Sequence, residues 1–263
     1  MKKACFFELE LGRLRVFTLP VLEDNYTYLL SNGKSAVCVD PADAGPVLGL
    51  LDEGRLSLNM VLVTHYHGDH TAGVRELKEK TGCVVSGPQA GGPSWVDCKV
   101  VDDQYIKFGQ TKFKTLATPG HTVEHMCYYE EVEGALFSGD TLFGGGCGRV
   151  FSGQYNLMWK SLCRLAELPD QTMLFYGHEY TMENLHFARE YEPGNRALQD
   201  RFVQLSDRLN KKLLPVPSTL GLEKATNPFL RTRSMEIRAH LNMKEASGLE
   251  VFTELRRRKD RYG

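Results

Sequence analysis

The chain has no long hydrophobic run, and its acidic and basic residues nearly cancel. Among its 263 residues, 32 Lys and Arg stand against 33 Asp and Glu, which gives a formal net charge of -1. A chain without a basic excess is not expected to bind nucleic acid or an anionic membrane through bulk charge. No apolar stretch approaches the roughly 20 residues that a membrane-spanning helix needs. We therefore expect neither nucleic acid nor a membrane as a partner.

Several other signatures are missing as well. The seven cysteines form no C-x-x-C pair and show no paired zinc spacing. An odd and scattered number favours buried thiols in a reducing compartment. No segment resembles a signal sequence, so we expect a cytoplasmic protein, with an organelle left open. A Gly-x-Ser-x-Gly motif is also absent, which argues against a Ser-His-Asp hydrolase.

Three histidines and one aspartate crowd into residues 64–70, with the sequence T-H-Y-H-G-D-H. An apolar run, Met60–Val63, leads into this segment as a predicted strand. Residues two apart on an extended segment point the same way, so His65 and His67 can bind one cation together. The pattern indicates a metal site at the end of a strand.

The second half of this segment can serve a second cation. Gly68 allows a sharp turn, because glycine tolerates backbone angles that other residues avoid. Asp69 and His70 then precede a helix that we predict over residues 71–80. A lone histidine is more often a hydrogen-bonded core residue, but four such groups in six positions would be costly to cluster without a cation.

Further ligands are expected downstream, where three more apolar strands end in a turn and a ligand-type residue. These residues are His121 after Phe113–Leu116, Asp140 after Ala135–Ser138, and His178 after Met173–Tyr176. Each one alone is a weak signal, since a strand-terminal Asp or His is more often a turn or cap residue. Together with residues 64–70 they predict one site along the edge of a sheet.

The arrangement of apolar residues changes along the chain. Two strand-rich stretches, residues 13–110 and 111–178, would suit a two-sheet sandwich flanked by helices. Beyond them, helices are predicted over residues 182–191, 195–212 and 249–261, and the middle one carries an ordinary core-facing stripe. That stripe consists of Leu198, Phe202, Leu205 and Leu209.

Matching motifs along nearly the whole chain carry a family resemblance. They lie at Asp24–Leu29, Thr64–His70, Thr118–Thr122, Ser138–Phe143, Gly146–Arg149, Gly177–Tyr180 and Asn227–Arg231. The chain resembles the metallo-β-lactamase fold superfamily and, within it, the glyoxalase II family of hydroxyacylglutathione hydrolases. The T-H-x-H-x-D-H motif identifies only the superfamily, whereas the helical tail with N-P-F-L-R occurs in a far narrower group of proteins. The resemblance implies an α/β fold, an αββα two-sheet sandwich over residues 1–179, with a C-terminal α-helical, substrate-binding domain over residues 180–263.

The resemblance also implies a dinuclear metal site. It assigns His65, His67 and His121 to one metal, Asp69, His70 and His178 to the other, and Asp140 to a bridge between them. Asp69 and Asp140 are thereby the expected catalytic carboxylates. Imidazole and carboxylate ligands suit zinc, and iron or manganese remain alternatives.

The implied reaction is hydrolysis of S-(2-hydroxyacyl)glutathione, with S-D-lactoylglutathione giving glutathione and D-lactate. A hydroxide bridging the metals would attack the thioester, because a metal lowers the pKa of bound water from about 16 to roughly 7. The leaving thiolate, with a conjugate acid of pKa about 8.5, needs no strong general acid. A monomer is expected.

Substrate contacts implied by the resemblance are Arg149, Phe151, Tyr180, Arg256 and Lys259. Some family members have Lys and Tyr where this chain has Arg149 and Phe151, so the charge is kept and a hydroxyl is lost. A basic helix end can hold the two carboxylates of glutathione through charge-assisted hydrogen bonds. The alternative is a solvated basic face, which is favourable at a helix C-terminus.

Three other functions are alternatives. Persulfide dioxygenases share the fold but use one iron and lack the long helical tail. A nuclease of the superfamily would want a basic surface. A non-enzymatic relative would have lost a ligand, and none is missing. Cys147, in a glycine-rich segment, is interpreted as a packing residue rather than a nucleophile.

Overall fold

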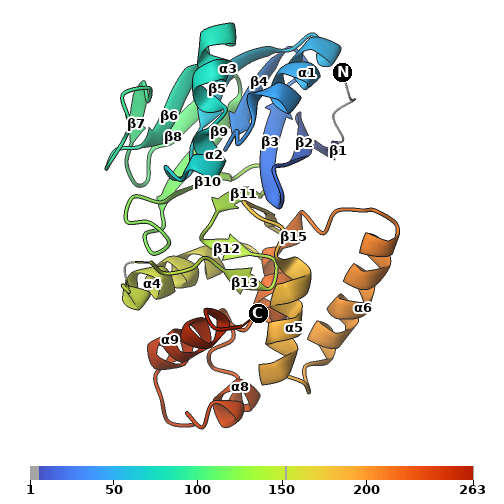
Figure 1. Cartoon of the computed structure of the whole chain (residues 1–263), viewed down its shortest axis with the longest axis vertical. Coiled ribbons are helices and arrows are strands. Elements are labelled where there is room, and N and C mark those ends of the chain that lie inside the picture. Colours follow the sequence, from blue (N-terminus) through green and yellow to red (C-terminus); the bar gives the residue numbers. More distant parts are fainter. Residues whose placement is uncertain (1–5, 152, 263) are drawn as a thin grey trace. The chain divides into compact units, whose positions relative to one another are not determined.

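The computed structural model describes residues 6–151 and 153–262 (Figure 1). The expectation about an N-terminal signal segment falls partly on residues 1–5, outside the described residues. Contacts divide the described chain into two compact units. The first comprises residues 6–117 and 124–139, and the second comprises residues 118–123 and 140–262 without residue 152.

A seven-stranded sheet, in the order β1 to β7, forms one layer of the first unit. Its strands are β1 (Phe7–Leu11), β2 (Leu14–Val21), β3 (Asn25–Ser31), β4 (Ser35–Val39), β5 (Ser57–Leu62), β6 (Val84–Pro88) and β7 (Cys98–Val100). Pairs from β1 to β4 are antiparallel, and those from β4 to β7 are parallel. Because parallel strands end at the same edge, the residues that follow β4 and β5 lie side by side.

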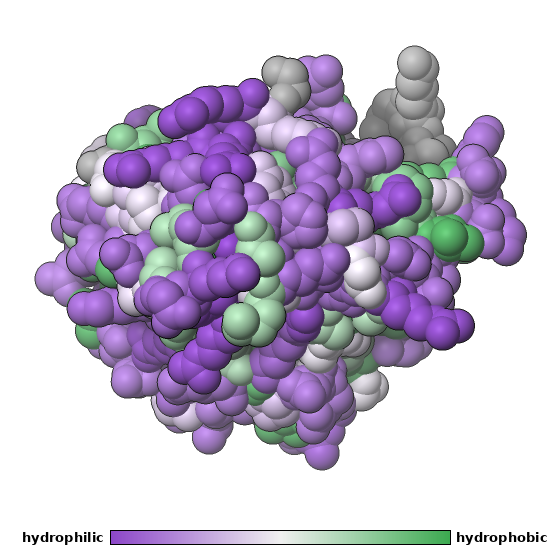
Figure 2. All heavy atoms as spheres, turned by 90° about the horizontal axis from the view of Figure 1, so that it is seen from below, coloured by the Kyte–Doolittle hydropathy of each residue, from purple (hydrophilic) through white to green (hydrophobic). Residues whose placement is uncertain are grey.

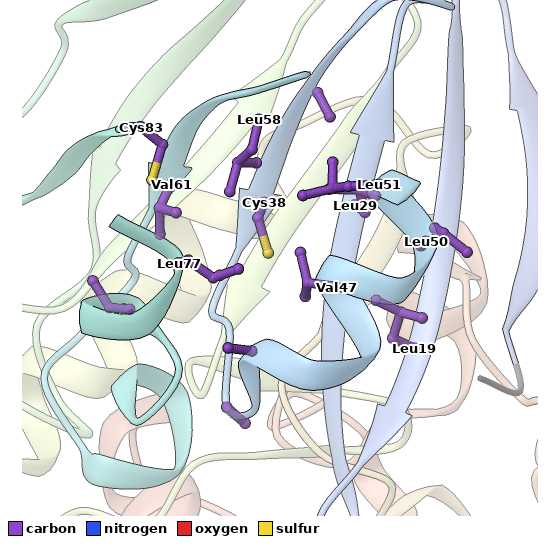
Figure 3. Packing of buried hydrophobic residues seen from close by; sticks show 14 of the residues in the cluster. Leu19, Leu29, Cys38, Val47, Leu50, Leu51, Leu58, Val61, Leu77 and Cys83 are labelled. Carbon is purple, nitrogen blue, oxygen red and sulfur yellow. The ribbon is translucent and has the colours of Figure 1, made fainter. Parts of the chain in front are cut away.

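Helices α1 (Ala44–Gly54) and α3 (Val74–Thr81) cover this sheet, as Figure 3 shows. Val47 and Leu51 of α1 and Leu77 of α3 pack with sheet residues that include Leu29 and Val61. Each such side chain, when fully buried, contributes about 1.5–3 kcal/mol through the hydrophobic effect. This core fixes the strands from which the first half of the candidate site projects.

The helix predicted over residues 71–80 is interrupted in the structure. A short helix, α2 (Gly68–Thr71), is followed by α3, which begins at Val74. The break occurs at Gly73, whose amide donates to the carbonyl oxygen of Pro41 at 2.9 Å. A Cβ atom at Gly73 would lie 2.7 Å from the backbone nitrogen of Ala44. This close approach between segments diverts the chain and is invisible to local helix propensity.

A second sheet in the first unit is an antiparallel meander. It consists of β8 (Tyr105–Phe108), β9 (Thr111–Ala117), β10 (Met126–Glu130) and β11 (Ala135–Gly139). It contacts the first sheet: the rings of Tyr28 and Phe137 lie 5.5 Å apart, and the Tyr128 hydroxyl donates to the Val63 carbonyl oxygen at 2.7 Å. The predicted packing of two sheets is confirmed within this unit.

The second unit is mainly helical beyond its short strands. Its elements are β12 (Leu142–Phe143), β13 (Gly146–Cys147), α4 (Tyr155–Ala166), β14 (Met173–Tyr176), α5 (Thr181–Tyr191), α6 (Arg196–Asn210), β15 (Ser218–Thr219), α7 (Leu220–Thr226), α8 (Met235–His240) and α9 (Gly248–Lys259). Strands β12 and β13 pair, as do β14 and β15. The helices predicted over residues 182–191, 195–212 and 249–261 correspond to α5, α6 and α9.

The stripe predicted on α6 is largely confirmed. Leu198 and Leu205 are buried and pack with Leu185 of α5, and Phe202 is partly buried against the same cluster. Leu209 differs, because 38% of its surface is exposed near the end of α6. The last turn of the helix therefore extends past the core that its apolar spacing was expected to reach.

Hydrophobic side chains on the surface form small, separate patches on the face shown in Figure 2, which is largely hydrophilic. Within residues 6–151 and 153–262, no helix combines the length and the apolar character needed to cross a membrane.

Candidate metal centre

His65 and His67 face each other at the end of β5 in the first unit. The Nε2 atom of His65 lies 3.0 Å from the Nδ1 atom of His67. His65 is buried, and the segment between the two residues is extended, as the spacing predicts. Two imidazole nitrogens aimed at one point can be shared by a cation when both are deprotonated.

Thr64 and Asp40 determine which nitrogen of His65 can bind a metal. The Thr64 hydroxyl donates to Oδ2 of Asp40 at 2.6 Å, so its oxygen remains an acceptor for Nδ1–H of His65 at 3.0 Å. With its proton on Nδ1, His65 presents the lone pair of Nε2. This hydrogen-bond chain orients the imidazole toward His67.

Asp40 also orients His70. Its Oδ2 atom accepts from Nδ1–H of His70 at 3.0 Å, and its Oδ1 atom accepts from the Thr64 amide at 2.8 Å. Nε2 of His70 is then directed to the opposite side, 3.7 Å from Oδ2 of Asp69. A carboxylate behind a ligand histidine fixes its tautomer and raises its basicity.

Asp69 is held by a residue of β3. Asn25 donates from Nδ2 both to Oδ2 of Asp69 at 3.0 Å and to its carbonyl oxygen at 3.1 Å. Asp69 is partly exposed, whereas His70 is buried. Each of the four residues predicted from the T-H-x-H-x-D-H motif is therefore placed at the edge of the sheet in the first unit.

Two buried residues beside these histidines were missed by the sequence analysis. Asp40 follows the apolar strand β4, which is the same signal that identified Asp140, and could have been found by it. His125 is fully buried, and its ring stacks on that of His65 with 5.0 Å between centroids. No local pattern distinguishes His125 from an ordinary core histidine.

The second unit brings the three downstream residues together. Nε2 of His121 lies 3.3 Å from Oδ2 of Asp140, and Nε2 of His178 lies 3.4 Å from the same oxygen. All three side chains are buried. One carboxylate oxygen between two imidazoles is an arrangement that suits a bridging ligand.

The backbone of residues 148–149 contacts His121. Nδ1–H of His121 donates to the carbonyl oxygen of Arg149 at 2.9 Å, which leaves Nε2 for a metal. A Cβ atom at Gly148 would lie 1.9 Å from the carbonyl oxygen of Asp140. Only glycine can occupy this position, because a side chain would force the two segments apart.

Two of the expected substrate residues are accessible, and a third is partly so. Phe151 is 63% exposed, with its ring centroid 5.3 Å from that of His121. The Arg149 side chain is 57% exposed. Tyr180 is partly buried, and its ring stacks on His178 at 5.0 Å. Phe151 and Tyr180 therefore lie against two candidate ligands of the second unit, whereas the Arg149 side chain forms an ion pair with Asp260 at 3.5 Å.

Arg256 and Lys259 differ, since both are buried and paired within the protein. Arg256 donates to the Cys147 carbonyl oxygen at 2.7 Å, and the ammonium of Lys259 forms an ion pair with Glu183. Lys259 also lies against the rings of Phe187 and Tyr262. Their contact with substrate stays a prediction.

Cys147 is also buried. Burial raises the pKa of its thiol to about 11, although the Arg256 guanidinium acts in the opposite direction. A protonated thiol is a weak nucleophile near neutral pH. These surroundings agree with the packing role expected for Cys147.

The donors in each unit fit divalent metals. Imidazole nitrogens and carboxylate oxygens bind zinc, iron and manganese, and buried groups of this kind are costly to gather without a cation. In the first unit, one ligand atom each of Asp40, His65 and His70 lie within 4.8 Å of one another. Because Asp40 already accepts two hydrogen bonds from side chains, we interpret it as a supporting residue rather than a ligand.

Two family profiles match adjacent parts of the chain. Residues 21–178 match the metallo-beta-lactamase superfamily, and residues 179–262 match the C-terminus of hydroxyacylglutathione hydrolase. The division of the chain at residue 179 stays a prediction.

Similar proteins include several hydroxyacylglutathione hydrolases. The one from Methylococcus capsulatus is 47% identical, with 94% of this chain and 98% of the relative covered. The one from Rhizobium meliloti is 41% identical, with 91% and 95% covered. Among solved structures, the BLEG-1 B3 metallo-beta-lactamase has a TM-score of 0.60 at 23% identity, covering 86% of this chain and 99% of its own.

A further solved structure, of a protein in a di-iron-bound form, has a TM-score of 0.58 at 26% identity and covers 85% of this chain and 100% of its own. The predicted metallo-β-lactamase fold with a helical C-terminal region is confirmed by these matches. The chain therefore belongs to the metallo-β-lactamase superfamily and, within it, to the hydroxyacylglutathione hydrolase family.

Proposed function

We propose that this chain hydrolyses the thioester of S-(2-hydroxyacyl)glutathione, taking S-D-lactoylglutathione to glutathione and D-lactate. The observation that carries the proposal is the 47% identity, over nearly the full length of both chains, to the Methylococcus capsulatus hydroxyacylglutathione hydrolase. The two sets of oriented His and Asp residues support it, because they supply the ligand types that metal-dependent hydrolysis requires.

Two divalent metals are proposed as cofactors. His65, His67 and His121 would hold one metal, Asp69, His70 and His178 would hold the other, and Asp140 would bridge them. The orientation of His65, His70 and His121 supports this assignment, since each has its Nδ1 atom engaged by a protein oxygen or hydroxyl. Bound divalent cations supply Lewis acidity that activates water and stabilises negative charge on the thioester oxygen.

Zinc is the metal that we propose. The similar protein solved in a di-iron-bound form makes iron the alternative, and manganese suits the same ligands. We further propose a monomer located in the cytoplasm. Metal analysis, sedimentation and cell fractionation test these three points.

The protein's own residues would bind and orient the thioester. The exposed guanidinium of Arg149 can meet a glutathione carboxylate, and the exposed ring of Phe151 can pack on the apolar parts of the substrate. The ring of Tyr180 stacks on that of His178. Its hydroxyl lies 3.3 Å from Nδ1 of His178 and so orients the imidazole. The thiolate product leaves without a strong general acid, because thiols have a pKa of about 8.5.

The test is to count metals in the purified protein and to follow hydrolysis of S-D-lactoylglutathione before and after treatment with a chelator. We expect turnover to stop on chelation and to return with added zinc. Asp140→Asn should lower kcat by about 10³-fold, or about 4 kcal/mol in the activation barrier.

Asp170→Asn is the matched control, because Asp170 is an exposed carboxylate of the same unit that is paired with Lys224. Its turnover should equal that of the unaltered protein. Absence of chelator-sensitive hydrolysis would leave the chain with the fold but without the proposed activity.

A further inference from the structure

In the second unit, residues of the C-terminal helical region form hydrogen bonds with a glycine-rich loop. We use the term glycine-rich loop for residues 144–149. Glu223 of α7 accepts a hydrogen bond from the Gly145 amide at 2.8 Å, and Asn227 donates from Nδ2 to the Gly146 carbonyl oxygen at 2.9 Å. Both Glu223 and Asn227 are fully buried. The N-P-F-L-R motif that marks the family therefore begins with a residue that binds this loop.

Arg256 of α9 makes the next contact along the loop. Its guanidinium is buried, with 5% of the residue exposed, and donates to the Cys147 carbonyl oxygen at 2.7 Å. On the other side it pairs with Asp260 at 3.1 Å, and its flat face lies over the ring of Phe229 at 5.3 Å. A planar guanidinium held on two sides and over one face is a rigid support for a carbonyl group.

The far end of the glycine-rich loop contacts His121. Gly148 lies so close to Asp140 that no side chain fits, and its amide donates to the Thr141 carbonyl oxygen at 3.3 Å. The next residue, Arg149, supplies the carbonyl oxygen that accepts from Nδ1–H of His121 at 2.9 Å. Only one residue, Gly148, therefore lies between Cys147, whose carbonyl Arg256 holds, and Arg149, whose carbonyl orients His121.

We propose that Arg256 is a positioning residue for His121, acting through the Cys147 carbonyl and the glycine-rich loop. The inference rests on the proposed function in one respect, namely that His121 is a metal ligand. This role is distinct from contact with the substrate, because the Arg256 side chain is buried in the second unit, where it contacts the Cys147 carbonyl and Asp260.

Loss of this support should weaken metal binding rather than only substrate binding. If the Cys147 carbonyl loses its donor, the loop can shift, and the Arg149 carbonyl then constrains the ring of His121 less. Partners behind a ligand histidine typically change metal affinity by 10–100-fold. A group that only contacted substrate would raise KM and leave metal affinity unchanged.

The experiment compares Arg256→Gln with Arg258→Gln in the full chain loaded with zinc. Arg258 is on the same helix and pairs with Glu254 away from the loop, so its variant is the matched control. Zinc affinity and release are measured by competition with a chromophoric chelator. We expect Arg256→Gln to weaken the binding of one of two zinc ions by about 10–100-fold, and Arg258→Gln to match the unaltered protein.

Two further variants keep the test decisive if Arg256→Gln fails to fold. Arg256→Lys retains one donor for the Cys147 carbonyl and should recover part of the zinc affinity. Asp260→Asn leaves Arg256 in place but removes the charged partner that Arg256 shares with the half-exposed Arg149 side chain, and should give a smaller loss than Arg256→Gln. Circular dichroism confirms that each variant is folded.

Unchanged zinc affinity in folded Arg256 variants, with a raised KM, would overturn the positioning role and leave only substrate contact. Failure of the proposed function looks different, since the unaltered protein would then bind no metal or show no thioester hydrolysis.

Discussion

The two units support their proposed metal ligands by different means. In the first unit the proposed ligands are neighbours in sequence, and a buried carboxylate, Asp40, orients His70 directly. In the second unit His121 and His178 come from distant segments, and His121 is oriented by a main-chain carbonyl. That carbonyl belongs to a loop that is held by residues of the helical tail.

This difference determines how each half can be disturbed. A supporting side chain can be removed by one substitution, which acts on the ligand at once. A supporting carbonyl cannot be removed, so a substitution must act on the residues that hold its loop. We therefore expect larger losses from changes to Asp40 than from changes to Arg256.

The largest effect should come from Asp40→Asn. An amide nitrogen in place of Oδ2 cannot accept from Nδ1–H of His70, and the altered group also disturbs Thr64. We expect metal affinity to fall by about 100-fold, at the upper end of the range for residues behind a metal-binding histidine. Chelator competition on the folded variant measures this loss.

Asp43→Asn serves as the control for Asp40→Asn. Asp43 is an exposed residue whose side chain caps α1 by accepting from the Gly45 amide, and no contact links it to a histidine within the described part of the chain. It should retain full metal affinity. Equal metal affinity in the two variants would remove the distinction between side-chain and main-chain support.

An intermediate effect is expected from Lys259→Ala. Lys259 is on the same helix as Arg256, and its variant tests the binding of an anionic substrate separately from the support of a metal ligand. Lys259 is buried and paired with Glu183, and no contact links it to the glycine-rich loop among the described residues. We expect KM for S-D-lactoylglutathione to rise about 10-fold, or about 1.4 kcal/mol, near the lower end of the contribution of a charge-assisted hydrogen bond. Zinc affinity should stay unchanged.

A small neutral thioester provides the comparison for Lys259→Ala, because it has no carboxylate to lose. Its KM should hardly move, and added salt should reduce the difference between the two substrates. Equal increases in KM for both thioesters would show that Lys259 shapes the protein rather than meeting an anionic substrate.

The sequence located the candidate ligands better than the residues that support them. Apolar strands that end in glycine and a ligand-type residue are local patterns, and they placed His121, Asp140 and His178 at strand ends. The contact between Arg256 and Cys147 joins residues that are far apart in sequence, so no local pattern predicts it. The prediction that Arg256 meets substrate came from the resemblance and says nothing of its buried partners.

The same limit applies to the fold. The helices α5, α6 and α9 follow from apolar spacing, because each buries one face. The break between α2 and α3 depends on Gly73 meeting another segment, and the exposure of Leu209 depends on where the neighbouring core ends. Both are decided by tertiary packing, which overrides local preference.

Acid sensitivity of the folded state should also differ between the units. In the second unit Glu192 is buried, and burial alone would raise its pKa. Hydrogen bonds from Arg231, Ser234 and Asn195 outweigh burial and lower the pKa below its ordinary value of 4.5. In the first unit the pKa of Asp97 is also lowered, mainly by Lys78, but this pair is exposed.

A carboxylate with a lowered folded-state pKa contributes stability above its unfolded value, and that stability is lost as the pH falls through the folded value. Glu192→Gln should therefore destabilise the protein by about 2 kcal/mol at pH 7, and by much less below the folded pKa of Glu192. Asp97→Asn should cost about 0–1 kcal/mol at either pH, because exposed ion pairs are weak. Urea unfolding at both pH values, followed by circular dichroism, measures the two differences. A loss for Glu192→Gln that is the same in acid and at neutral pH would mean that shape, and not the ionised carboxylate, holds Arg231 and Ser234 in place.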